Sequence, residues 1–80
     1  MNLDTLSDLE LMAVHKAIHE RVIKLERDLK WYERMSERNP DYITKFAVAD
    51  TEYRTLISIR KLTSEELTLR NYRTNLAHKK

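Results

Sequence analysis

Apolar residues recur along the first half of the chain at alternating spacings of four and three. The apolar members of the series are Leu11, Ile18, Val22, Leu25, Leu29 and Tyr32. His15 fills the one polar slot between them. A seven-residue repeat of this kind places its members on one face of a helix, as in a coiled coil. The pattern predicts a long helix over residues 8–38 whose stripe must pack against another helix.

Both ends of this helix carry local signals. Ser7 and Glu10 have the spacing of a capping box, in which each side chain bonds the backbone N–H of the other residue. At the far end, Pro40 forces the residue before it out of the α region and itself suits the first turn of a helix. We therefore expect a turn at residues 39–41, with Asn39 or Asp41 capping a second helix over residues 41–78.

The second helix opens with a stripe of the same spacing. Its members are Tyr42, Phe46, Ala49, Tyr53 and Leu56. Because the turn is short, the two helices must run antiparallel, and positions whose numbers sum to about 79 should face each other. This register places His15 opposite Thr63 and Ser64, so both stripes become polar at the same level.

Beyond Leu56 the apolar stripe of the second helix changes phase. The earlier register would put Arg60 and Thr63 inside the seam. The apolar residues instead follow a different stripe, whose members are Ile59, Leu62, Leu69 and Leu76. Either the helix breaks near residues 62–64 and restarts, or it continues through a stutter that turns its apolar stripe toward another surface. We favour a continuous or kinked helix, since no glycine or proline marks a stop.

Composition supports a purely helical fold. The 80 residues include no glycine and one proline, and 35% are charged, which is typical of a chain that is helical throughout. We predict an all-α antiparallel helical hairpin, coiled-coil-like, forming a single domain over residues 1–80. A hairpin of this size buries one face of each helix, so we expect dimerisation or a partner protein to complete it.

Several kinds of chemistry have no support in the sequence. The chain has no cysteine, which excludes disulfides and thiolate metal sites and suits the cytoplasm. It has no apolar run near 18 residues, so we expect no membrane span. His15 and His19 could share a metal, but the HExxH pattern is absent, and we interpret them as a hydrogen-bonded polar layer. We expect no metal, no cofactor and no catalytic residue.

Two surfaces are candidates for binding a protein partner. Trp31 falls outside the packing stripe, and with Met35 and Tyr42 it resembles an interface hot spot at the closed end of the hairpin. The alternative is that its ring covers the core. The other candidate surface lies on the rotated stripe and consists of Leu69, Tyr72, Arg73 and Leu76.

The sequence as a whole indicates a non-enzymatic interaction module that binds another protein by its helix faces. Small glycine-free chains of this kind often serve as accessory or inhibitor proteins, including those of phages. The first alternative is a nucleic-acid-binding protein that uses the basic residues Arg70, Arg73, Lys79 and Lys80, although the net charge is only +2. The second alternative is a helical enzyme with an intersubunit site lined by Arg60.

Overall fold

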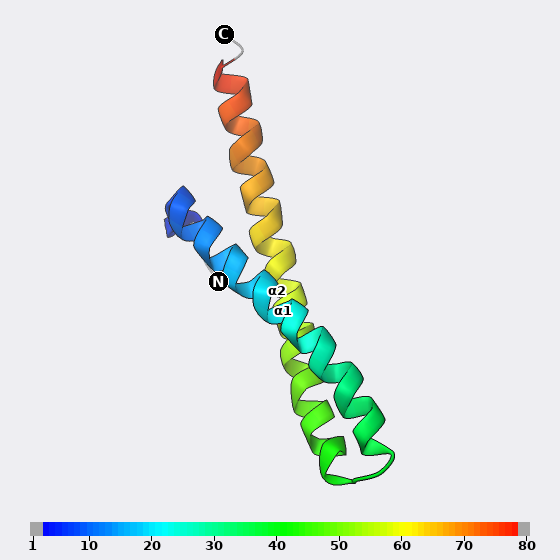
Figure 1. The fold of residues 1–80 in the computed structure, drawn as a ribbon. Helices are drawn as coiled ribbons and strands as arrows, with labels where there is room; N and C mark the ends of the chain where they lie inside the picture. The colour runs from blue at the N-terminus through cyan, green and yellow to red at the C-terminus, as the bar shows by residue number, and fades with distance from the viewer. Residues whose placement is uncertain (1–2, 79–80) are drawn as a thin grey trace.

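The chain folds into two long helices that pack side by side. The computed structural model describes the backbone of residues 3–78 and the side chains of residues 3–74. A short 3-10 helix, η1 (Leu3–Thr5), precedes α1 (Asp8–Ser36) and α2 (Asp41–His78). Figure 1 shows α1 and α2 running antiparallel from a single turn. No strand occurs in the described part of the chain. The predicted all-α helical hairpin is confirmed.

The start of α1 is fixed by the predicted capping box. Ser7 Oγ accepts from the backbone N–H of Glu10 at 3.1 Å, and Glu10 Oε1 accepts from the backbone N–H of Ser7 at 3.0 Å. Two of the unpaired N–H groups at the helix start are satisfied in this way. The hydrogen bond from the Ser7 backbone, with a smaller contribution from the Ser7 side chain, holds the pKa of the Glu10 carboxyl below its ordinary value.

The turn between the helices uses Asn39 as its cap. Helix α1 ends at Ser36, two residues earlier than predicted, because the N–H groups of Arg38 and Asn39 both bond the carbonyl of Met35. Asn39 Oδ1 then accepts from the backbone N–H of Asp41 at 3.0 Å. Of the two predicted capping residues, Asn39 therefore makes the bond that opens α2.

Helix α2 continues without interruption through residues 62–64, so the alternative of a break there is wrong. The interpretation that the packing stripe rotates is also wrong at Thr63, which is fully buried in the original register. Burial of this polar side chain is tolerated because its hydroxyl has two hydrogen-bond partners. Leu62 and Leu69 do lie off the seam, and both are exposed.

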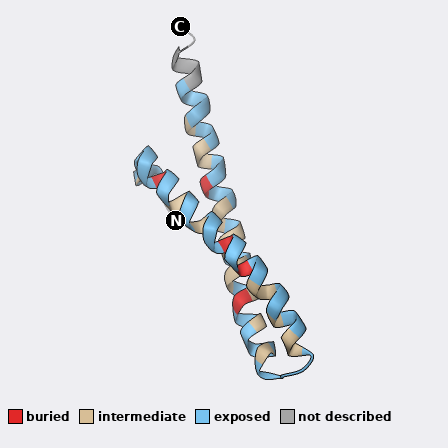
Figure 2. Cartoon of the chain, in the orientation of Figure 1, coloured by how far each residue is buried: buried red, intermediate tan, exposed pale blue. Residues whose placement is uncertain are grey.

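The core of the hairpin is thin. Its buried hydrophobic residues are Leu11, Val22, Leu25 and Ala49. Figure 2 shows the buried positions, in red, as isolated points along the two helices. The molecule measures 63 × 20 × 15 Å, and its radius of gyration is 17.3 Å, against about 12 Å for a compact domain of this length. None of the described helices is long and apolar enough to cross a lipid bilayer.

The two ends of the rod differ. At the closed end, residues 28–46, the helices are joined by the turn. At the open end, residues 3–14 and 64–78, the first turns of α1 diverge from α2 in Figure 1.

Candidate protein-binding surface

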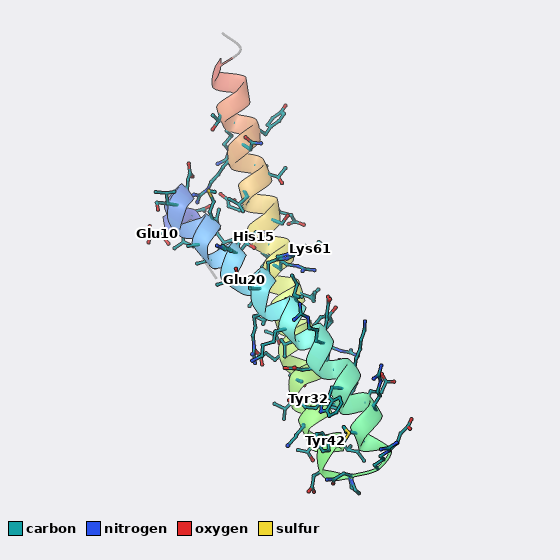
Figure 3. The ribbon with its side chains drawn as sticks, in the orientation of Figure 1. Glu10, His15, Glu20, Tyr32, Tyr42 and Lys61 are labelled. Carbon is teal, nitrogen blue, oxygen red and sulfur yellow. The ribbon has the colours of Figure 1, made fainter. Side chains whose placement is uncertain are left out.

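Polar side chains meet halfway along the hairpin, as the register predicted. His15 Nδ1 lies 2.7 Å from Thr63 Oγ1, and Figure 3 shows His15 and Lys61 at this level. The hydroxyl of Thr63 donates to the carbonyl of Arg60 at 2.9 Å. Because a hydroxyl has one proton, Thr63 must accept from His15, whose proton then lies on Nδ1. This bond fixes the relative register of α1 and α2.

The second histidine of the pair faces a cation. Arg60 Nη1 lies 3.3 Å from His19 Nδ1. A guanidinium only donates, so Nδ1 of His19 accepts and its proton lies on Nε2. The predicted polar layer accounts for both ring contacts. Among the described side chains, no three potential ligands cluster as a metal site would require.

Arg70 clamps the open end. Its guanidinium donates to Asp8 Oδ1 at 2.9 Å, to Glu66 Oε1 at 3.1 Å and to the carbonyl of Leu3 at 2.9 Å. These bonds, with Glu66 the stronger influence, raise the pKa of Arg70. Its side chain is only 17% exposed. Arg70 therefore ties η1 and the start of α1 to α2, and its charge is paired with two carboxylates.

The other residues of the nucleic-acid alternative are placed differently. Arg73 is exposed on α2. Lys79 and Lys80 lie outside the described residues. Arg70 is thus held by bonds within the chain. Arg73 is the one described member of this basic set that remains exposed and without an ion pair.

A bidentate ion pair joins the helices nearer the closed end. Arg21 Nε donates to Glu52 Oε2 at 2.7 Å, and Arg21 Nη2 donates to Glu52 Oε1 at 2.9 Å. The bonds from Arg21 lower the pKa of Glu52 and raise that of Arg21. The sequence did not predict this pair, because facing positions in the seam have numbers that sum to about 79, and those of Arg21 and Glu52 do not. Opposite charges on adjoining edges of the two helices were the available signal.

The aromatic residues of the closed end divide between core and surface. The rings of Tyr32 and Tyr42 lie with centroids 5.9 Å apart, and Lys45 Nζ lies 4.7 Å from the centroid of Tyr42. Both tyrosines are labelled in Figure 3. Tyr42 is half-buried, as is Met35, whereas Trp31 is 53% exposed. Trp31 is therefore a surface residue. Tyr42, in contrast, also takes part in the packing of the closed end through its contact with Tyr32.

Cations surround Trp31 on α1. Its neighbours on the helix, three, four and seven positions away, are Lys24, Arg27, Asp28, Arg34 and Met35. Three of the five are basic and one is acidic. None of the three cations forms an ion pair with the described side chains. The exposed ring thus lies in a basic setting.

The predicted open-end residues form a separate surface. Leu69 is 47% exposed and Tyr72 is 62% exposed. Arg73 is exposed beside them, and the side chain of Leu76 lies outside the described residues. The two candidate surfaces are at opposite ends of the rod, so the structure does not bring them together.

The hollows between the helices are shallow and open. One lies along the closed half and is lined by Arg21, Tyr32, Lys45, Val48 and Glu52, among others. Another lies beside the polar layer and includes Arg60, Lys61 and Glu65. Arg60, the residue of the enzyme alternative, lines this second hollow together with the cation Lys61 and the carboxylate of Glu65.

Comparison with known proteins does not extend this picture. No protein-family model, no curated protein and no solved structure matches the chain. The helical hairpin is a fold that carries many unrelated functions. The function must therefore be inferred from the protein's own surface.

Proposed function

We propose that the protein is a non-enzymatic helical interaction module that binds another protein through exposed apolar and aromatic side chains. The observation that supports this is the distribution of large hydrophobic residues. Nine of them are exposed in the described part of the chain, whereas four hydrophobic residues are buried. Single exposed hydrophobic residues are ordinary, but surfaces this rich in them are typical of interaction sites.

The closed-end surface, Trp31 with Met35 and Tyr42, is the proposed anchor for a partner protein. Tryptophan, tyrosine, methionine and arginine are enriched in the central contacts of protein interfaces. The basic neighbours of Trp31 would steer an acidic partner toward it and set the salt dependence of the association rate.

The open-end surface, Leu69, Tyr72, Arg73 and Leu76, offers a helix face that can lie in a groove or across a partner. Binding of this kind acts by covering a surface, which suits an accessory or inhibitor protein. The lack of cysteine makes a reducing cytoplasm the proposed place of action.

The test is position-specific crosslinking followed by reconstitution. A photoreactive phenylalanine derivative at position 31 should capture one protein in the native host, whereas the same group at exposed Lys16 on α1 should not. The captured protein is then purified, and Trp31→Ala should weaken its binding about tenfold or more. Lys16→Ala serves as the matched control. Capture that does not depend on position, or an unchanged affinity of W31A, would refute the proposal.

A further inference from the structure

Helix α2 carries two heptad stripes on opposite sides. The inner stripe, which includes Ala49, Tyr53 and Thr63, packs against α1. A second series, again spaced by three and four, runs along the exposed side of α2, and two of its members, Val48 and Glu65, also line the hollows beside α1. Its members are Val48, Thr51, Thr55, Ser58, Leu62, Glu65, Leu69 and Tyr72, and all are exposed. We call this series the outer stripe.

The outer stripe is less polar than its sequence suggests. The hydroxyls of Thr51, Thr55 and Ser58 donate to the carbonyls of Ala47, Thr51 and Arg54 at 2.9, 2.9 and 3.2 Å. The proton of each of these hydroxyls is therefore already bonded within the helix, and each threonine also carries an apolar methyl group. Glu65 is the one charged member of the series.

A 3.5-residue repeat of this kind is the pattern of a coiled-coil seam. Leu62, Leu69 and Tyr72 are 49, 47 and 62% exposed, respectively. From Val48 to Tyr72 the stripe runs for about 36 Å along a straight helix. A helix of matching length and period is the partner that such a face fits.

We infer that a second copy of the chain occupies the outer stripe, with the two α2 helices antiparallel. The inference rests on charge complementarity in one register, in which residue numbers of facing positions sum to about 126. In that register Lys61 faces Glu65 of the partner subunit, and Glu52 faces Arg73 of the partner subunit. Each attraction occurs twice, because a two-fold interface uses the same patch on both chains.

Lys61, Glu65 and Arg73 are available for these pairs, whereas Glu52 would be shared, because both of its carboxylate oxygens already accept from Arg21. Lys61 and Glu65 are exposed and form no ion pair within the described side chains. Arg73 is likewise exposed, and the Glu52 side chain remains 39% exposed beside Arg21. A parallel arrangement would instead place Glu65 against Glu65 of the partner subunit, where two like charges repel. The antiparallel register is therefore the one that the surface favours.

Such a dimer also explains the thin core. Pairing through α2 gives a four-helix arrangement in which each α2 is covered on both sides, and each α1 lies outermost. The inference deepens the proposed function, since it names a second copy as the partner of α2. It leaves Trp31 free for a different protein.

The first experiment measures oligomeric state. Sedimentation equilibrium of the full chain over a concentration series should show a monomer–dimer equilibrium. Leu62→Asp should weaken dimerisation about a hundredfold or more, because it buries an unpaired charge next to Glu65. Leu9→Asp is the matched control, since Leu9 is 79% exposed on α1 and lies off the outer stripe. Circular dichroism verifies that both variants remain helical.

The second experiment tests orientation, using the absence of native cysteine. In the antiparallel register Ser58 faces Leu69 of the partner subunit, so the double variant S58C/L69C should form intermolecular disulfides. Single Leu69→Cys should not, because the two cysteines would lie about 18 Å apart along the axis. Efficient crosslinking of L69C alone would overturn the antiparallel arrangement.

A helical wild-type protein that stays monomeric at every concentration would overturn the inference, as would an L62D variant that dimerises normally. Either result leaves the proposed function standing, because capture at position 31 does not require the dimer. Conversely, a dimer with no partner captured at Trp31 would sink the proposed function and keep the inference.

Discussion

Thr63 Oγ1 accepts a hydrogen bond from His15 Nδ1 at 2.7 Å, across 48 positions of sequence. Thr63 is fully buried, and the two residues lie in the polar layer between the hydrophobic halves of the seam. The layer acts as a register mark, because a shift of α2 by one turn would leave both groups facing apolar side chains.

Replacing Thr63 with valine keeps the shape of the side chain and removes its hydroxyl. T63V should reduce the free energy of unfolding by about 1–3 kcal/mol, because the Nδ1–H group of His15 then has no acceptor. The double variant H15L/T63V should recover to within about 1 kcal/mol of the wild type, since neither partner is left unpaired. Urea titration followed by circular dichroism measures both.

The control for this pair is Thr68→Val, whose exposed hydroxyl bonds only the backbone carbonyl of Ser64. It should change stability by less than about 0.5 kcal/mol. Equal effects of T63V and T68V would show that the contact with His15 contributes nothing to stability.

Replacing Arg70 with methionine should loosen the open end selectively. The variant loses the bonds to Asp8, Glu66 and the Leu3 carbonyl but keeps most of the aliphatic volume. Hydrogen exchange should become faster in the first turns of α1, over residues 8–14, and stay unchanged at the closed end. Exchange read by mass spectrometry distinguishes the two regions. Arg73→Met, an exposed neighbour, should leave the whole pattern as in the wild type.

The Arg21–Glu52 pair predicts a dependence on acid. The folded-state pKa of Glu52 lies below its ordinary value of 4.5, so its contribution is present above that pH and is lost as the pH falls through the folded value. Wild type should therefore exceed Glu52→Gln in stability at neutral pH, by up to about 1 kcal/mol because the pair is well exposed. The difference should disappear in strong acid.

Urea midpoints for both proteins across an acid series measure this effect. Glu33→Gln makes the same change of charge at an exposed position without an ion-pair partner in the described chain. It should show a smaller dependence on pH. A wild-type advantage that persists in strong acid would contradict the assignment to ionised Glu52.

Truncating Trp31 should cost little stability. The ring is 53% exposed, so W31A should lower the free energy of unfolding by less than the truncation of a buried core residue does. Leu25→Ala, at a position 2% exposed, should cost about 2–5 kcal/mol. Thermal melts of the two variants give the comparison. A loss for W31A as large as for L25A would mean that the tryptophan belongs to the core.

Local signals in the sequence predicted the parts of the fold that depend on near neighbours. The capping box of Ser7 and Glu10 and the turn at Asn39 are each decided by residues within a few positions. The phase of the helix placed Trp31 outside the packing stripe, but it left open whether the ring covers the core, and the structure shows the residue 53% exposed. In each case the physical cause lies within one or two helical turns.

The features that sequence missed depend on distant partners. The antiparallel register placed Thr63 opposite His15, but the apolar periodicity alone indicated that the packing stripe turns away from Thr63, because it does not account for the hydrogen bond from the other helix. Arg70 was taken as a free cation, yet its partner Asp8 lies 62 positions away. Whether a polar residue lies inside the seam therefore depends on the side chain that faces it from the other helix.

The uninterrupted course of α2 has a mechanical consequence. Its 38 residues make a rod about 57 Å long, with no glycine hinge anywhere in the chain. Trp31 and Leu69 are therefore held about 30 Å apart along the long axis of the rod, and the angle between their directions around that axis is fixed. Seven residues added to both helices would lengthen this spacing by about 10 Å and keep the two faces aligned, whereas three or four would turn one face relative to the other. The hairpin therefore fixes the distance between its two exposed faces as well as presenting them.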